Sequence, residues 1–127
     1  LGLQVLLNRG AAHLIENFGT DELKATYCER MYGGVWAGTM CLTEAGAGSD
    51  LGEIKTTAVK QSDGSYFLNG EKIFITSGDH DLTPNIIHAV LARIPGAPAG
   101  ATGKYGPSTA VSPRARAAAS RAVSSGR

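Results

Sequence analysis

The pattern of apolar residues changes at the Gly33-Gly34 pair, and this change restricts the possible folds more than any other feature of the sequence. Before the pair, leucines and Phe18 recur at helical spacing, and Gly19 is a suitable helix end. Thr20 then fits an N-cap, with acids in the first turn where the helix dipole favours them. We therefore expect two helices, one ending at Gly19 and one running from Thr20 to about Tyr32.

Beyond the glycine pair, the sequence favours β-strands. Strands are predicted at residues 35–43, 53–61 and 86–94. Asp63-Gly64 and Asn69-Gly70 are both typical of tight hairpins, because both dipeptides readily adopt positive φ. Further strands are therefore placed at about 65–69 and 71–77. The fold class predicted from these patterns is α+β, with helices followed by an antiparallel β segment.

From residue 96 onward the composition changes again. The stretch contains no Leu, Ile, Phe or Trp, so it buries too little apolar surface to offset its ordering entropy. We predict that residues 96–127 are disordered. Residues 100–127 carry five basic side chains and no acid, whereas residues 1–99 carry seven basic and eleven acidic ones. A basic tail can attract nucleic acid, but only Tyr105 offers a ring for base stacking, so we predict a solvated tail and no nucleic-acid partner.

The cysteines and histidines suggest no metal site. Cys28 and Cys41 fit neither a disulfide framework nor a zinc pattern, and we interpret both as small buried hydrophobic residues. Trp36 is expected to anchor the packing near the junction of helices and strands. No apolar stretch reaches the ~18 residues of a membrane span, and no signal segment opens the chain, so the expected location is cytoplasmic. Leu1 already lies in an apolar pattern, which suggests that the chain is cut from a longer one.

Residues 41–50 form a short acidic loop that is rich in glycine. No lysine lies near Gly46 or Gly48, so the loop is not a Walker phosphate loop. The spacing of Gly46, Gly48 and Gly52 does not match the dinucleotide fingerprint either. Two interpretations stay open on spacing alone. The loop is a simple turn, or it is a cradle of backbone N–H groups for an anion, with Ser49 adding a hydroxyl donor.

Several segments, in this order, resemble the acyl-CoA dehydrogenase family. The upstream FGTDELKATYCERMYGG resembles a helix of that family. Leu42-Thr43-Glu44-Ala45 with Gly48-Ser49-Asp50 resembles its L-T-E-P-x-x-G-S-D signature, and Asn69-Gly70-Glu71-Lys72 with Phe74-Ile75-Thr76 resembles N-G-x-K-x-[WF]-I-[TS]. The resemblance covers residues 1 to about 100. The stretch from Gly78 further resembles the branch that includes 3-methylmercaptopropionyl-CoA dehydrogenase and some long-chain relatives.

The resemblance implies a domain arrangement and a chemistry. It implies the end of an N-terminal helical domain (1–34), part of an antiparallel β-barrel-like, flavin-binding middle domain (35–95) and the basic tail (96–127). It also implies FAD and an acyl-CoA thioester, from which the family removes an α-proton and a β-hydride to leave a trans-2-enoyl-CoA. An electron-transfer flavoprotein or similar acceptor is the implied partner, and the intact family forms homo-oligomers.

The resemblance also implies roles for single residues. The implied cofactor-binding residues are Met40, Leu42, Thr43, Gly48, Ser49, Phe74, Ile75 and Thr76. Thr43 would contact the flavin ring by backbone and hydroxyl, Ser49 would meet the diphosphate and lie near the pantetheine of the substrate, and Thr76 would lie near flavin N5. Glu44 and Asp50 would brace the loop rather than act as acid and base. Without the motif, Phe74 would be assigned to the core, and both threonines would be ordinary strand residues.

The sequence also departs from the family pattern. Ala45 replaces the usual proline, which removes a constraint on φ. The family's catalytic carboxylate belongs to a C-terminal helical domain, and no residue here matches it. We therefore expect no catalytic residue and no turnover from this chain alone, with a flavin- or CoA-binding remnant as the alternative function. After residue 100 an Ala/Arg/Ser/Gly/Pro mixture replaces the family's apolar strand, and we hypothesise a shift of reading frame.

Overall fold

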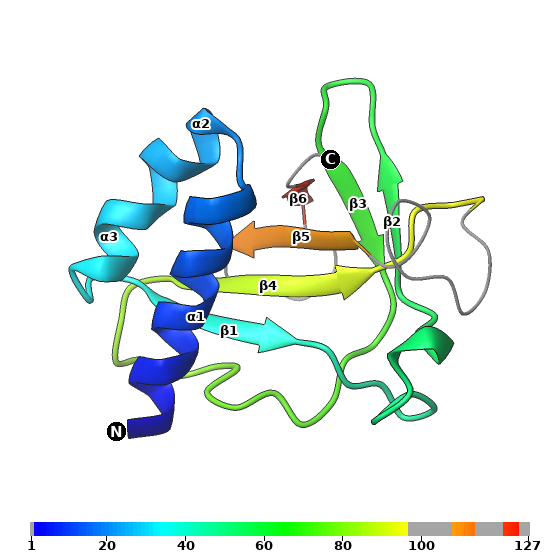
Figure 1. The fold of residues 1–127 in the computed structure, drawn as a ribbon, viewed down its shortest axis with the longest axis horizontal. Helices are drawn as coiled ribbons and strands as arrows, with labels where there is room; N and C mark the ends of the chain where they lie inside the picture. Colours follow the sequence, from blue (N-terminus) through cyan, green and yellow to red (C-terminus); the bar gives the residue numbers. More distant parts are fainter. Residues whose placement is uncertain (1, 97–107, 114–120, 125–127) are drawn as a thin grey trace.

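Two helical segments pack on a β-sheet in the computed structural model of the chain, which describes residues 2–96, 108–113 and 121–124 (Figure 1). Helix α1 spans Gly2–Phe18. The second segment is continuous but changes pitch, from α2 (Asp21–Leu23) through the π-helix η1 (Lys24–Cys28) to α3 (Glu29–Tyr32). The two predicted helices are therefore confirmed, as is the cap, because the Leu23 N–H donates to the Thr20 hydroxyl at 3.3 Å.

The sheet has six strands and mixed direction. The strands are β1 (Ala37–Cys41), β2 (Thr57–Lys60), β3 (Tyr66–Asn69), β4 (Ile86–Ala92), β5 (Ser108–Pro113) and β6 (Arg121–Ser124). Their order across the sheet is β1-β4-β5-β6-β3-β2, and a short 3₁₀-helix, η2 (Leu51–Glu53), precedes β2. The mixed helix and sheet agree with the predicted α+β class. None of the helices in the described part of the chain is long and apolar enough to cross a membrane.

The prediction of an antiparallel segment is wrong for one pair of strands. β1 and β4 run parallel, with Thr39 opposite His88, whereas the other pairs are antiparallel. The long connection between β1 and β4 carries β2 and β3 to the other end of the sheet, so β4 returns in the direction of β1. No ladder pairs β1 with β2 in the described residues, and only an isolated bridge joins Thr57 to Arg93 after β4, so the barrel-like closure is not confirmed.

The two hairpin dipeptides behave differently. Asp63-Gly64 closes the β2–β3 hairpin as predicted, with φ of 83° at Gly64. The predictions of a hairpin at Asn69-Gly70 and of a strand at 71–77 are wrong. Residues 71–77 do not form a strand, and they run beside the loop after β1. A Cβ on Gly70 would lie 2.4 Å from Thr56 Oγ1, so this glycine permits a close approach of two backbones rather than a hairpin.

The segment that was expected to be disordered contains β5 and β6. β5 lies along the edge of β4, with Ala110 opposite Val90, and β6 joins β5 to β3. Composition did not indicate these strands, because an open strand edge offers backbone hydrogen bonds that need no apolar side chain. Residues 97–107, 114–120 and 125–127 of the predicted disordered tail lie outside the described residues.

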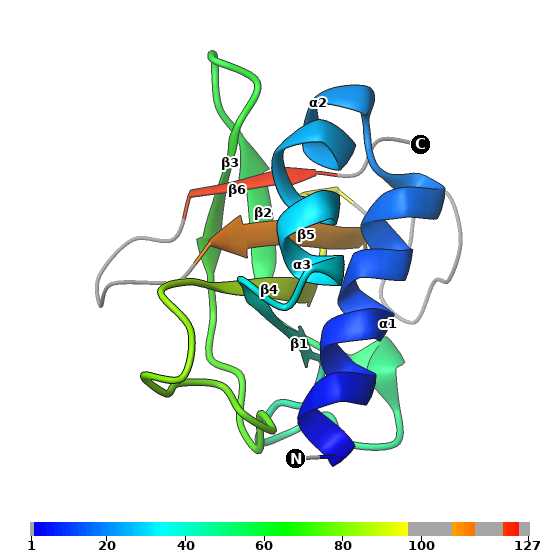
Figure 2. The same ribbon diagram turned by 90° about the vertical axis from the view of Figure 1, so that its left-hand side faces the viewer.

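The core forms where α1 and the second helical segment meet the sheet (Figures 1 and 2). The buried cluster consists of Ala11, Ala12, Ile15, Leu23, Met31 and Ile87. Gly38 on β1 permits this contact, because a Cβ there would lie 2.8 Å from Met31 Cε and 2.9 Å from Ala11 Cβ. Trp36 packs against the cluster under the Arg30 guanidinium, which confirms its predicted role as an anchor. This packing fixes β1 and hence the start of the loop that follows it.

Candidate functional site

The loop directly after β1, residues 42–50, is called the bend here. Glu44 and Ala47 exchange reciprocal backbone hydrogen bonds of 3.1 Å, so its first half is a tight turn. Gly46, Gly48 and Ser49 are exposed, and a Cβ built on either glycine would meet no atom within 4 Å. The bend is therefore a turn that leaves open space on its outer side.

Glu44 holds the inner side of the bend. Its side chain is only 9% exposed, and its carboxylate accepts hydrogen bonds from the N–H groups of Lys55 (2.7 Å) and Thr56 (3.0 Å) and from the Thr56 hydroxyl (2.5 Å). Burial raises the pKa of Glu44, but these bonds and the ammonium of Lys72 outweigh burial and lower its pKa to about 2. Glu44 is thus a charged structural brace, and Asp50 braces the other end by accepting from Gly52 N–H at 3.0 Å. Both predicted bracing roles are confirmed.

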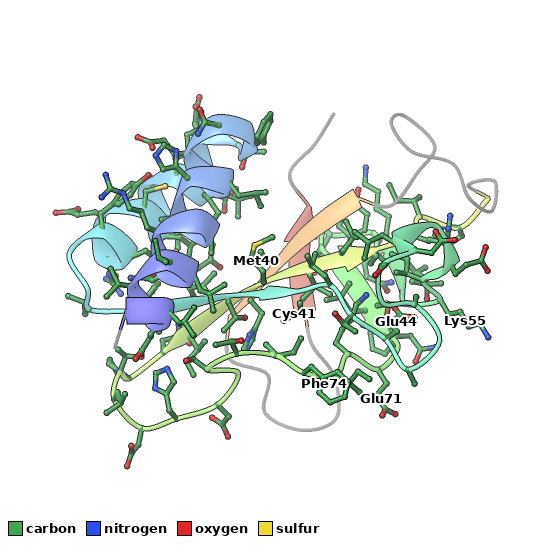
Figure 3. The ribbon with its side chains drawn as sticks, turned by 60° about the horizontal axis from the view of Figure 1, so that its bottom comes forward. Met40, Cys41, Glu44, Lys55, Glu71 and Phe74 are labelled. Carbon is green, nitrogen blue, oxygen red and sulfur yellow. The ribbon has the colours of Figure 1, made fainter. Side chains whose placement is uncertain are left out.

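Lys72 was not given a role by the sequence interpretation, although it is part of the N-G-x-K motif. Its Nζ lies 2.8 Å from Glu44 Oε1 and 2.9 Å from the Leu42 carbonyl oxygen, and its side chain is 9% exposed. Figure 3 shows Glu44 beyond Cys41, past the end of β1. The loop that lacks a lysine of its own therefore receives one from 28 positions downstream. The motif was the only sequence signal for this contact.

The second motif lies beside the bend. The Ile73 N–H donates to the Thr43 carbonyl at 2.9 Å, which joins the two motifs directly. Phe74 follows with a φ of 57° and a side chain that is 87% exposed, so it does not belong to the core (Figure 3). Ile75 is half-buried and Thr76 is exposed. The structure thus places Thr43, which is half-buried, and Phe74, which is exposed, in neighbouring segments.

The donors of the bend suit an anionic dinucleotide. The carbonyl of Thr43 is bound by Ile73, whereas its N–H and hydroxyl have no hydrogen-bond partner among the described residues. The backbone N–H groups of Gly48 and Ser49 likewise have no acceptor within the described part of the chain. Backbone N–H groups on an exposed glycine-containing loop can hold a phosphate without a lysine. These donors therefore fit an anionic group such as the diphosphate of a dinucleotide.

The remaining sequence-predicted residues lie around this bend. Leu42 and Met40 are half-buried, and Met40 and Cys41 project to opposite faces of β1 (Figure 3). Cys41 is buried, which raises the pKa of its thiol, and lies 3.9 Å from His88 Nδ1. His88 Nδ1 also lies 2.7 Å from the hydroxyl of Thr39, so this β4 residue contacts the neighbouring strand β1. Groups of three or more potential metal ligands are absent from the described residues.

The comparisons with known proteins agree with these contacts. A family model, "Acyl-CoA dehydrogenase, middle domain", matches residues 39–121. The chain is 52% identical over 102 residues to 3-methylmercaptopropionyl-CoA dehydrogenase of Ruegeria pomeroyi, covering 80% of this chain and 17% of that protein. The chain therefore belongs to the acyl-CoA dehydrogenase family. The matched part is the middle domain, and the chain spans about a sixth of the length of this relative.

Solved structures show the same fold. An acyl-CoA dehydrogenase of Geobacillus kaustophilus is 32% identical with a TM-score of 0.62, over 84% of this chain and 28% of that one. A structure described as an electron transferring flavoprotein of Acidaminococcus fermentans is 27% identical with a TM-score of 0.68, over 95% of this chain and 33% of that one. The arrangement of helices and sheet therefore resembles that of these relatives, and the sheet lies within the matched middle domain.

Proposed function

We propose that this chain is the flavin-binding part of an FAD-dependent acyl-CoA dehydrogenase, which oxidises an acyl-CoA thioester to a trans-2-enoyl-CoA. The single observation that supports this most is the hydrogen bond from Ile73 to Thr43, because it brings the two family motifs together at an open surface. When bound, FAD supplies the hydride acceptor of the reaction. The residues of this chain bind and orient it.

The roles proposed for these residues follow from their exposure and free donors. Thr43 would donate its N–H and hydroxyl to the flavin ring, and the N–H groups of Gly48 and Ser49 would hold the diphosphate. Ser49 would also lie near the pantetheine of the substrate. Phe74, with Ile75 behind it, would cover the ring face, and the neutral hydroxyl of Thr76 would lie near N5. Met40 on β1 and Leu42 at the start of the bend would support it.

We further propose that the chain alone does not turn over substrate, because none of its residues matches the carboxylate base of the family. In the complete enzyme, an electron-transfer flavoprotein or similar acceptor would take the electrons, and the subunits would form a homo-oligomer. Several statements stay predictions. They are the domain limits 1–34, 35–95 and 96–127, the cytoplasmic location, the shift of reading frame, and the absence of metal and nucleic-acid partners. A non-catalytic remnant that binds flavin or CoA is the alternative function.

The proposal is tested with the 127-residue chain and FAD. We expect flavin absorbance near about 450 nm to elute with the protein in gel filtration. Phe74→Leu should weaken FAD binding, whereas Phe67→Leu, a matched change at another exposed ring, should not. An assay of acyl-CoA oxidation with an artificial electron acceptor should show no turnover. A chain that binds no FAD, or that binds it equally well without Phe74, would refute the proposed site, and real turnover would refute the proposed inactivity.

A further inference from the structure

We infer that Lys72 is a positioning residue, which clamps the bend from its inner side and fixes the direction of its donors before a cofactor binds. This inference rests on the proposed function, since it concerns the same bend. Lys72 is not placed against the cofactor. Its Nζ is bound to the Leu42 carbonyl and the Glu44 carboxylate, on the buried side of the chain.

The clamp immobilises three consecutive residues by their acceptors. Leu42 is held through its carbonyl by Lys72, Thr43 through its carbonyl by Ile73, and Glu44 through its carboxylate by Lys72, Lys55 and Thr56. Every one of these bonds uses an acceptor of the bend. The N–H and hydroxyl of Thr43 are therefore left as donors on a backbone that has little freedom to turn. Donors that are fixed in advance bind a ligand more tightly, because less ordering is required at binding.

The clamp also reduces the negative charge of the bend. The bend carries the carboxylates of Glu44 and Asp50 and no basic residue of its own, which would repel an anionic dinucleotide. Lys72 balances the buried Glu44 at 2.8 Å, and a buried carboxylate without its cation would be strongly unfavourable. A lysine at this position therefore acts on the cofactor through the shape and the net charge of the bend.

The first test measures amide hydrogen exchange in the unaltered chain without FAD. The clamp predicts that the N–H groups that donate to the bend, those of Lys55, Thr56 and Ile73, are protected and open together. The N–H groups of Gly48 and Ser49 are the internal comparison, since they are exposed and have no acceptor in the described residues. If the amides of Lys55 and Ile73 exchange as fast as that of Ser49, the clamp does not exist. This measurement needs no substitution.

The second test compares three variants of the full chain. Lys72→Met removes the charge, Lys72→Arg keeps it, and Lys60→Met is the same change at an exposed lysine on β2. We expect Lys72→Met to speed exchange at Lys55 and Ile73 and to weaken FAD binding by about tenfold or more, as when a buried charged partner is removed. Lys72→Arg should restore most of the binding, and Lys60→Met should leave it unchanged. Protection of Ile15 in α1 reports whether each variant is folded.

The outcomes separate this inference from the proposed function. If the unaltered chain binds no FAD, the proposed function fails, and the exchange data still decide whether the clamp exists. If the unaltered chain binds FAD and folded Lys72→Met binds it within about twofold of the same affinity, the positioning role is refuted. If Lys60→Met weakened FAD binding equally, the positioning role would also be refuted. The effect would then come from the loss of one positive charge anywhere on the chain.

Discussion

Replacing Glu44 with glutamine tests the structural role of the brace, because glutamine keeps the size and removes the charge. The pKa of Glu44 is lowered from 4.5 to about 2 in the folded chain. One pKa unit corresponds to about 1.4 kcal/mol, so the charged form of Glu44 contributes on the order of 3 kcal/mol to stability at neutral pH. The side chain is 9% exposed, so screening by solvent reduces this figure little. Glu44→Gln should lower the free energy of unfolding by an amount of this size at pH 7.

The pH dependence distinguishes a charge effect from a packing effect. A carboxyl group with a lowered pKa stabilises the fold above its unfolded value, and the stabilisation is lost as the pH falls through the folded value. The difference between the two proteins should therefore be largest above about pH 4.5 and should shrink towards pH 2. Urea unfolding of both proteins between these values measures it. Glu71→Gln, at an exposed position beside Lys72, is the control and should change little.

A difference between Glu44→Gln and the unaltered chain that is the same at every pH would refute this reasoning. It would mean that the glutamine disturbs the packing of the bend and that the charge contributes nothing. A small difference at pH 7 would refute the magnitude and would indicate that water enters the contact with Lys72.

Three further substitutions, with Gly48→Ala as a control, test the fold. Gly38→Val should lower the free energy of unfolding by about 1–3 kcal/mol in urea titrations, because its side chain would collide with Met31 and Ala11. Gly70→Ala should cost at least about 1 kcal/mol in the same titrations, since φ is 153° and Thr56 leaves no room, whereas Gly48→Ala, in open space, should cost less. Thr20→Ala should lower stability by about 1 kcal/mol through loss of the helix cap, measured by thermal unfolding.

Features that depend on neighbouring residues were predictable from the sequence. The end of α1 at Gly19, the cap at Thr20 and the β2–β3 hairpin at Asp63-Gly64 each depend on a few adjacent residues, and each is found where it was expected. A glycine or an N-cap residue acts through its own backbone angles and its nearest hydrogen bonds. Such signals do not require knowledge of the partner elements.

Features that depend on distant partners were not predictable in the same way. The stretch from Glu71 to Ser77 has the composition of a strand, but Ile73 bonds to Thr43 and Lys72 to Glu44, so contacts with the bend replace the expected hairpin. The parallel pairing of β1 with β4 depends on a connection of more than forty residues. No short stretch of the sequence indicates the relative direction of the two strands. Composition suggested disorder for the residues of β5. They form a strand because they pair with the edge of β4.

In the proposed flavin site, the position of the lysine distinguishes this acidic glycine-rich loop from a lysine-bearing phosphate loop. In a phosphate loop the lysine faces the anion and adds positive charge at the ligand. Here the ammonium of Lys72 forms an ion pair with Glu44 on the inner side of the bend. The pair therefore presents little net charge to the outer surface. In the proposed site, the N–H and hydroxyl of Thr43, which have no partner among the described residues, would stabilise added electron density as neutral donors. If the proposed function holds, the loop therefore binds through fixed dipoles, and its charges serve to hold those dipoles in place.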